Sequence, residues 1–261
     1  MVADGFHSLT DGGNNIAGLV ITGYAYAPPD EGHPYGHRKF ETAATLGLGI
    51  ALLSVSYHLV SQALSRSPDA DLPEIGPLAW IVMLVTLVVN MFVASYEARQ
   101  GRKLQSSYLI ADSAHTRSDI YVTLGVIASF AGAQAGVAWM DALVSVGIAV
   151  FIAYLGTQIL VGSFHTLTDR AVIPIDKLAP HVLAVPGVID CREIRTRGGP
   201  GSVYVDLIVH VDGAMPMRDA HDVADWIEAA LMMQHPEIVD VVVHLEPAGK
   251  KTPAIRRDEK A

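Results

Sequence analysis

The sequence predicts an α-helical membrane domain followed by a small α+β domain with the element order αββαβ. Of its 261 residues, 51% are hydrophobic and only 17% are charged, and the mean hydropathy is +0.33. Soluble domains carry about 25% charged residues. The long apolar runs fill the first two thirds of the chain, whereas most of the charge follows residue 165. We therefore expect a membrane domain at residues 1–171, an αββαβ domain at 172–247 and a disordered tail at 248–261.

Five stretches of the first domain approach the roughly 20 apolar residues that a helix needs to cross a bilayer. The first stretch is the most polar, but its C-terminal half is clearly hydrophobic, and we interpret it as a span with a polar inner face. The other four contain no Lys or Arg. The predicted spans are Ala3–Ala27, Leu46–Leu64, Pro77–Tyr96, Ile120–Met140 and Ala142–Phe164.

Basic residues mark one side of the predicted membrane domain. Alternate connections hold Arg and Lys, namely Arg38, Lys39, Arg99, Arg102, Lys103, Arg170 and Lys177, whereas the others hold only Arg66. By the positive-inside rule, the basic connections are cytoplasmic. The second domain is then cytoplasmic too, and the chain is a multi-pass protein of the cell membrane, in contact with the lipid bilayer.

Short elements bounded by turns replace the long apolar runs in the second domain. Val203–Val211 alternates between polar and apolar residues, as a half-buried strand does. Glycine and proline at 198–201 predict a turn just before it. The predicted elements are a helix at Asp176–Ala184, strands at Val188–Thr196 and Val203–Val211, a helix at Arg218–Gln234 and a strand at Val239–Leu245.

Charge and cysteine content exclude some classes of protein. The net charge of −9 argues against a nucleic-acid partner, because no basic patch is available to neutralise phosphates. The single cysteine, Cys191, excludes a disulfide framework and a cysteine-rich zinc site. A lone cysteine of this kind is most often a small, buried, apolar residue.

Two His-x-x-x-Asp pairs lie in or beside the predicted spans: His7 with Asp11, and His115 with Asp119. Residues four apart share one face of a helix, so each pair offers one imidazole nitrogen and one carboxylate oxygen. Ionisable groups in a bilayer are costly and mark functional sites. Two such helices side by side supply the four ligands of a tetrahedral Zn²⁺ site, whereas a single pair is better explained as a hydrogen bond on a helix surface.

An aspartate also lies seven residues before the second member of each pair. Asp4 precedes Asp11, and Asp112 precedes Asp119. This repeated spacing suggests that the polar face of each helix extends over two turns, but both aspartates equally suit helix N-caps. They are left outside the predicted ligand set.

Four motifs resemble those of the cation diffusion facilitator family, in the same order and over essentially the whole chain. They are the segments at residues 3–11, 33–39, 111–119 and 167–170. The resemblance implies a metal/proton antiporter, usually a homodimer, with six transmembrane helices and a cytoplasmic αββαβ domain of metallochaperone type. By that comparison the sequence begins in the family's second helix, so we expect the first helix to be lacking here.

The resemblance also implies roles for individual residues. It places the transport site on His7, Asp11, His115 and Asp119, a set associated with Zn²⁺ preference. It places a second site in the loop at Asp30, His33 and His37, although a turn with incidental histidines explains that segment equally well. It pairs Lys39 with Asp169 in a salt bridge at the cytoplasmic surface, where snorkelling of the lysine is the alternative.

For the cytoplasmic domain, the resemblance implies metal ligands at His221, His244 and Glu246. Two further ligand positions of the family hold Arg192 and Ile208, which cannot bind a divalent cation. His210 lies two residues from Ile208 on the same strand face and can take its place. The expectation is a mononuclear site at His210, His221, His244 and Glu246, and the alternative is a set of surface histidines.

These patterns together predict efflux of a divalent transition metal by alternating access, with Zn²⁺ displacing protons from the two imidazoles. Co²⁺, Fe²⁺ and Cd²⁺ accept the same ligands. The alternative function is a membrane metal sensor or scaffold of the same family that binds metal without moving it. No nucleotide-binding or aspartyl-phosphate motif indicates an ATP-driven pump, and no His-Glu-x-x-His indicates a zinc hydrolase.

Overall fold

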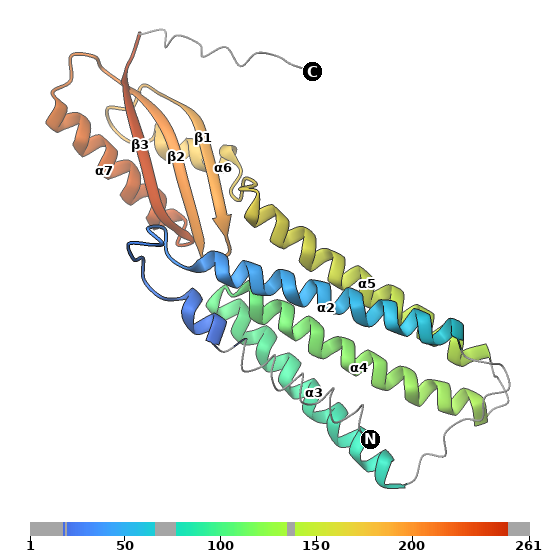
Figure 1. Ribbon diagram of the computed structural model, residues 1–261. Coiled ribbons are helices and arrows are strands. Elements are labelled where there is room, and N and C mark those ends of the chain that lie inside the picture. The colour runs from blue at the N-terminus through green and yellow to red at the C-terminus, as the bar shows by residue number, and fades with distance from the viewer. Residues whose placement is uncertain (1–17, 19, 66–76, 135–138, 250–261) are drawn as a thin grey trace. The chain divides into compact units, whose positions relative to one another are not determined.

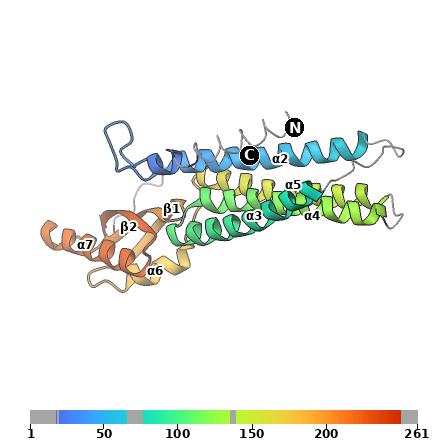
Figure 2. The ribbon, with the colours of Figure 1, turned by 90° about the horizontal axis from the view of Figure 1, so that it is seen from below.

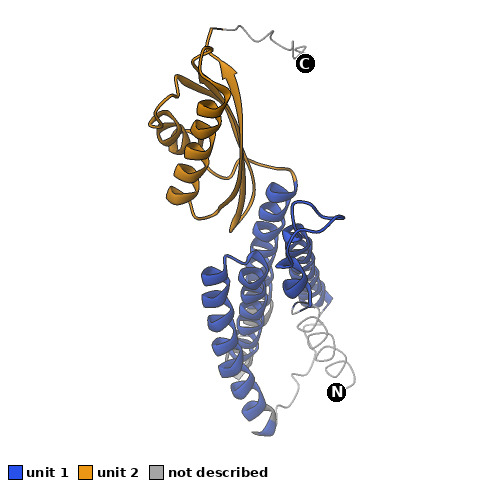
Figure 3. Ribbon diagram, turned by 90° about the vertical axis from the view of Figure 1, so that its left-hand side faces the viewer, with its two compact units in different colours: residues 1–167 blue, residues 168–261 orange. Residues whose placement is uncertain are grey.

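The computed structural model describes residues 18, 20–65, 77–134 and 139–249. The chain divides into two compact units, Met1–Leu167 and Thr168–Ala261, which are coloured separately in Figure 3. The predicted first span lies outside the described residues from its start to position 17. The predicted ligands His7 and Asp11 fall in this part. Residues 20–25 are helical.

Four long helices form the described part of the first unit. α2 lies along α5, and α3 lies along α4, with α4 also contacting both α2 and α5 (Figures 1 and 2). Helices of 28 residues are about 42 Å long, more than the roughly 30 Å of the hydrocarbon core. Their bounds are Arg38–Ser65 for α2, Pro77–Leu104 for α3, Ser107–Gln134 for α4 and Trp139–Leu167 for α5.

Among the described residues, three helices are long and apolar enough to cross a membrane: Arg38–Ser65, Trp80–Leu104 and Leu143–Leu167. They contain or largely overlap the predicted spans at 46–64, 77–96 and 142–164. In α4, the charged residues Asp112, Arg117 and Asp119 lie in the first half of the helix. It begins at Ser107, well before the predicted start at Ile120, so His115 and Asp119 lie inside a continuous helix.

Glycines bring α2 and α5 close together. A Cβ atom on Gly156 would lie 3.0 Å from the carbonyl oxygen of Gly49 and 3.2 Å from Cβ of Leu52. The Ser56 hydroxyl donates a hydrogen bond of 2.8 Å to the carbonyl oxygen of Ala149 across the same interface. Small residues and interhelical hydrogen bonds of this kind are typical of helix packing in membranes, where water does not drive association.

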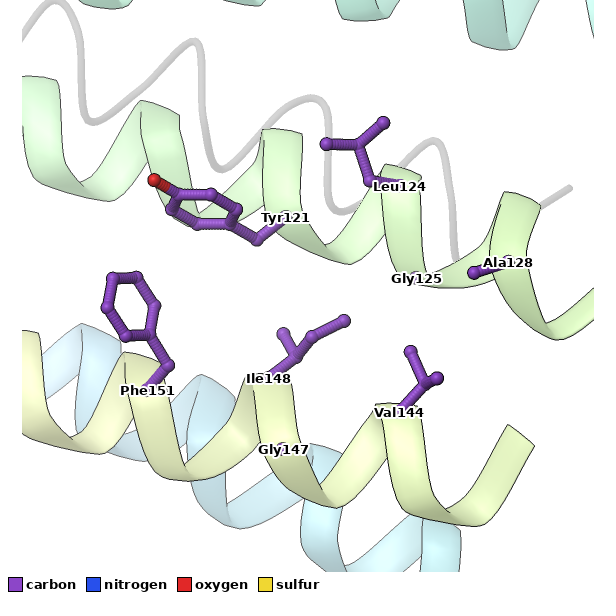
Figure 4. A pocket seen from close by; sticks show the side chains of 8 residues that line it. All are labelled: Tyr121, Leu124, Gly125, Ala128, Val144, Gly147, Ile148 and Phe151. Atoms are coloured by element: carbon purple, nitrogen blue, oxygen red, sulfur yellow. The ribbon is translucent and has the colours of Figure 1, made fainter. Parts of the chain in front are cut away.

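An apolar groove of about 400 Å³ lies between α4 and α5. Tyr121 and Phe151 face each other across it, with ring centroids 5.1 Å apart (Figure 4). A Cβ on Gly125 would clash with Ile148. The face of α4 that carries Tyr121 and Gly125 is therefore directed to α5. The groove is lined by Tyr121, Leu124, Gly125, Ala128, Val144, Gly147, Ile148 and Phe151.

The second unit is a three-stranded sheet with two helices. The strand order is β1-β2-β3, with β1 and β2 antiparallel and β2 and β3 parallel. The parallel pair requires a crossover, which α7 supplies. The bounds are Ile175–Leu183 for α6, Asp190–Gly199 for β1, Ser202–Val211 for β2, Met217–Gln234 for α7 and Ile238–Pro247 for β3.

The predicted αββαβ order is confirmed, and most element ends differ from the prediction by only a residue or two. β1 differs more, because it continues through Gly198 and Gly199, which pair with Val203 and Ser202. Gly198 has φ +116°, a backbone angle that glycine adopts readily. The predicted turn therefore contracts to Pro200 and Gly201.

α6 and α7 cover one face of the sheet (Figures 1 and 3). The alternating apolar residues of β2 are buried against these helices, among them Val205, Leu207 and Val209. The polar residues between them, including His210, lie on the opposite face. This alternation gives the sheet one core face and one face that can carry chemistry.

Replacing Ile227 with alanine should strongly destabilise the second unit. Ile227 is fully buried in the core between α7 and the sheet, and truncating a buried isoleucine costs about 2–5 kcal/mol. Denaturant unfolding of residues 168–249 measures the change. Met233→Ala on the same helix is the control, because that side chain is 75% exposed. Equal stability of the two variants would contradict the assigned core.

Candidate functional site

The second His-x-x-x-Asp pair lies one turn apart on α4. His115 and Asp119 are both partly buried. The hydroxyl of Ser118 donates to the carbonyl oxygen of His115 at 2.7 Å, and that of Thr123 donates to the carbonyl oxygen of Asp119 at 2.8 Å. These two bonds end on main-chain oxygens and do not involve the imidazole or the carboxylate.

In the part of the chain that the structure describes, the buried Nδ1 atom of His115 has no hydrogen-bond partner. Such a buried polar atom is costly unless it is satisfied. A cation bound to the imidazole would satisfy a ring nitrogen in this position. His7 and Asp11, the predicted partners from the first helix, lie outside the described residues.

Two further carboxyl groups, those of Glu97 and Asp112, lie near His115, and the sequence patterns had singled out only Asp112. Glu97 of α3 accepts a hydrogen bond of 3.0 Å from the hydroxyl of Thr116. Thr116 also donates to the main-chain oxygen of Asp112 at 3.2 Å. The only sequence signal was that Glu97 is the single acid in α3. Because α4 begins at Ser107, Asp112 lies inside the helix, and its interpretation as an N-cap is wrong.

The loop before α2 brings Asp30, His33 and His37 together. Among the described residues these three form the one group of at least three His, Cys, Asp or Glu side chains whose donor atoms all lie within 4.8 Å of one another. Nδ1 of His33 is 3.2 Å from one oxygen of Asp30, and Nε2 of His37 is 3.3 Å from the other. Such a set of nitrogen and oxygen donors suits Zn²⁺ and similar cations.

Local backbone geometry explains why the loop adopts this shape. The amide of Gly36 donates to the carbonyl oxygen of His33 at 2.9 Å, and Gly36 has φ +80°, which favours glycine. The turn folds His37 back over His33, with ring centroids 4.5 Å apart. His37 is only 2% exposed, and within the described part of the chain neither of its ring nitrogens makes a hydrogen bond.

The charge of Asp30 is stabilised by its neighbours. The main-chain N–H of His33 donates to its carboxylate at 2.6 Å. This hydrogen bond, with further contributions from the side chains of His33 and His37, holds the pKa of Asp30 below its usual range. The carboxylate is thus ionised throughout the physiological pH range, as a metal ligand must be.

On the open face of the cytoplasmic sheet, three strands bring His210, Glu246 and Asp190 together. Nε2 of His210 is 3.5 Å from Glu246, and its Nδ1 is 4.0 Å from Asp190. His244 lies 3.5 Å from the other oxygen of Glu246. A hydrogen bond from Arg192 is the main cause that keeps the pKa of Asp190 low. Asp190 was not among the predicted ligands, because only the strand register places it opposite His210.

The structure does not bring His221 to this group within one chain. His221 lies on α7, which covers the opposite face of the sheet, and its side chain is 72% exposed beside Asp225 at 3.7 Å. Its role as a ligand, like the salt bridge between Lys39 and Asp169, stays a prediction. Cys191 is partly buried against the core, and burial raises the pKa of its thiol, so it is a poor metal ligand.

Comparison with known proteins identifies both units. The family model described as "Cation efflux transmembrane domain" matches residues 1–168, and the one described as "Cation efflux protein, cytoplasmic domain" matches residues 173–248. The chain therefore belongs to the cation diffusion facilitator family of membrane cation-efflux proteins.

Two relatives match nearly all of this chain. Metal tolerance protein C1 of Arabidopsis thaliana is 30% identical over 95% of this chain, which spans 56% of that protein's length. The manganese efflux system protein MneS of Bacillus subtilis is 29% identical over 96% of this chain and 87% of its own length. The solved MamM CTD is 24% identical and covers 28% of this chain and 91% of its own, with a TM-score of 0.27.

Proposed function

We propose that this protein exports Zn²⁺ from the cytoplasm in exchange for protons, through a site formed by His7, Asp11, His115 and Asp119. The observation that supports this most strongly is the buried Nδ1 atom of His115, which has no hydrogen-bond partner among the described residues and belongs to a side chain one turn from Asp119. An intramembrane helix that holds such a group needs a charged or polar partner for it. A transported cation is a partner of the required kind.

Zinc is proposed as the cargo because of the ligand types. Two imidazole nitrogens and two carboxylate oxygens form a four-coordinate set that Zn²⁺ accepts in tetrahedral geometry. Mn²⁺, the ion named for the Bacillus subtilis relative, prefers oxygen ligands and octahedral coordination. The two histidines therefore favour Zn²⁺ over Mn²⁺, whereas Co²⁺, Fe²⁺ and Cd²⁺ are the closer competitors.

Proton exchange follows from the chemistry of the same ligands. An imidazole binds a metal only in its neutral form, and histidine changes charge near neutral pH. Zinc entering from the cytoplasm displaces protons from His7 and His115, and protons from the other side release it again. The helices carry the site between the two sides by alternating access.

The remaining groups have supporting roles in this proposal. Asp30, His33 and His37 bind a cation at the cytoplasmic loop. A regulatory site on the sheet is formed by Asp190, His210, His244 and Glu246. His221 contributes to this site only from the second copy of the chain in a homodimer. Lys39 and Asp169 join the helix ends. The carboxylates of Asp190 and Glu246 beside His210 also favour the second candidate function, a sensor that binds metal without transporting it.

Flux measurements on reconstituted protein test this proposal. Proteoliposomes with an internal zinc dye and an internal pH dye are offered Zn²⁺, Mn²⁺, Co²⁺, Fe²⁺ or Cd²⁺ under an imposed pH gradient. The proposal predicts the fastest flux for Zn²⁺, with proton movement in the opposite direction. A sensor would bind zinc and give no flux. Manganese flux faster than zinc flux would contradict the choice of metal.

Acidification should weaken zinc binding at the loop site through its histidines and not through Asp30. The lowered pKa of Asp30 keeps its carboxylate charged, and its contribution is lost only below the usual pKa range of aspartate. A metal binds an imidazole only in its neutral form, so the affinity for zinc should fall as the pH is lowered. Calorimetry on the wild type, corrected with the His33→Ala/His37→Ala double variant, measures this. An affinity that does not depend on pH would contradict imidazole ligation.

A further inference from the structure

The N-terminus of α4 is capped by a carboxylate that comes from another helix. The first N–H groups of any helix lack partners within it. Here the hydroxyl of Ser106 accepts from the amide of Leu109 at 3.2 Å. Glu41 of α2 accepts from the amide of Tyr108 at 3.2 Å and from the Ser106 hydroxyl at 2.5 Å. A negative charge at this position is also favoured by the helix dipole.

Glu41 is buried, which makes this contact hard to break. Its side chain is only 4% exposed. The guanidinium of Arg38, one turn earlier on α2, lies 3.4 Å from its carboxylate. If α4 moved away from α2, a buried carboxylate would lose its two donors, and that loss is far more costly than the loss of a surface contact. We therefore expect the start of α4 to move together with the start of α2.

The same contacts extend to both ends of the metal-binding loop. The guanidinium of Arg38 lies 3.8 Å from the centroid of the Tyr26 ring, which closes the loop between these two residues. The Tyr26 hydroxyl donates to the carbonyl oxygen of Leu104, at the end of α3, at 3.1 Å. We call Tyr26, Arg38, Glu41 and Ser106 the Glu41 clamp. It joins the helical segment at residues 20–25, α2, α3 and α4 at one end of the bundle (Figure 1).

In the sequence, the loop site lies between Tyr26 and Arg38, two members of this clamp. Asp30, His33 and His37 all fall between Tyr26 and Arg38, and His37 precedes Arg38 in the chain. Tyr24, which follows the predicted ligands His7 and Asp11 in sequence, packs edge-on against the His37 ring at 4.5 Å. A cation that fixes the loop therefore also fixes Arg38, and through Glu41 the start of the helix that carries His115.

We propose that Glu41 is a positioning residue that couples cation binding at the Asp30–His33–His37 site to the position of α4, and hence to the transport ligands His115 and Asp119. The coupling rests on the proposed function of both sites. In addition to holding a cation, the loop site senses cytoplasmic metal and determines the position of α4.

Hydrogen exchange at the start of α4 tests this coupling directly. In the full chain in lipid nanodiscs, added zinc should slow exchange of the amides that follow Ser106. The slowing should disappear in His33→Ala, which lacks a loop ligand, and in Glu41→Gln, which keeps the loop ligands. Glu31→Gln is the matched control, because Glu31 is exposed in the same loop, and it should behave as the wild type does.

Two further measurements, the zinc affinity of the loop and the rate of zinc transport, distinguish a loss of coupling from a loss of folding. Glu41→Gln should bind zinc at the loop with an affinity within about twofold of the wild type, yet transport it about tenfold more slowly, since a hydrogen bond to a buried charge is worth such a factor. If that variant does not fold, Ser106→Ala removes one donor and leaves the charge. It should lose part of the zinc-dependent slowing.

Each outcome decides between the two claims. Zinc-dependent slowing that persists in Glu41→Gln, or that is as large in Ser106→Ala as in the wild type where Glu41→Gln does not fold, would overturn the coupling. A wild-type chain that shows the slowing but no zinc flux would instead contradict the proposed transport and leave the clamp standing. Wild-type flux with no slowing at the start of α4 would overturn the clamp alone.

Discussion

Replacing His115 with alanine is expected to lower zinc flux by more than about a hundredfold, because losing even an outer-shell partner of a metal ligand costs 10–100-fold. His115 is a predicted ligand itself, and the imidazole offers the buried ring nitrogen that has no other partner. Asp119, one turn further on α4, cannot supply a nitrogen ligand in its place. The measurement is initial zinc flux into proteoliposomes at equal amounts of folded protein.

His58→Ala is the matched control for this experiment. His58 lies on α2 in the same helical unit, but its side chain is exposed and it belongs to neither predicted site. Its replacement should leave the flux close to that of the wild type. Near-normal zinc flux in His115→Ala would remove this residue from the transport site, whatever the behaviour of the control.

Replacing Gly156 with leucine is expected to separate α2 from α5 and to destabilise the fold of the first unit. A Cβ atom at this position already lies 3.0 Å from a main-chain oxygen and 3.2 Å from another Cβ. Neither of these neighbours is the end of a flexible side chain, so the helices themselves must move. Overpacking a close interface costs about 1–3 kcal/mol or more, and the loss of the Ser56 to Ala149 hydrogen bond adds to it.

Gly162→Leu separates this packing effect from the effect of leucine on helix propensity. Gly162 lies on the same helix and is exposed, and a Cβ there meets nothing within 4 Å. Both substitutions replace glycine by the same better helix former. Thermal unfolding in detergent should show a lowered midpoint for Gly156→Leu only. Equal midpoints would contradict the close crossing of α2 and α5.

The sequence predicted elements well wherever periodicity carries the information. The period of two in Val203–Val211 placed His210 on the open face of the sheet, and the spacing of four placed His115 and Asp119 on one face of a helix. The span prediction was less accurate at helix ends, because polar residues such as Asp112 continue a helix beyond its apolar run. The start of α4 at Ser107 is the clearest instance.

Contacts between distant segments were not predictable in this way. No sequence pattern indicates that β3 pairs parallel to β2 and sets Glu246 beside His210, or that Asp190 lies on the other side. Glu97 is the single acidic residue of α3, and Glu41 is the single acidic residue of α2. Only the packing of α3 and α2 against α4 shows that one carboxylate meets Thr116 and the other caps a helix.

The central claim is that one zinc ion binds between the two His-x-x-x-Asp pairs. X-ray absorption of zinc tests it most directly, on a chain whose loop and sheet histidines, His33, His37, His210 and His244, are replaced by alanine. The account predicts one bound zinc with two imidazole nitrogens and two carboxylate oxygens at about 2.0–2.2 Å, and no bound zinc once His7 and His115 are also replaced. A shell of six oxygens, or zinc retained after that replacement, would contradict it.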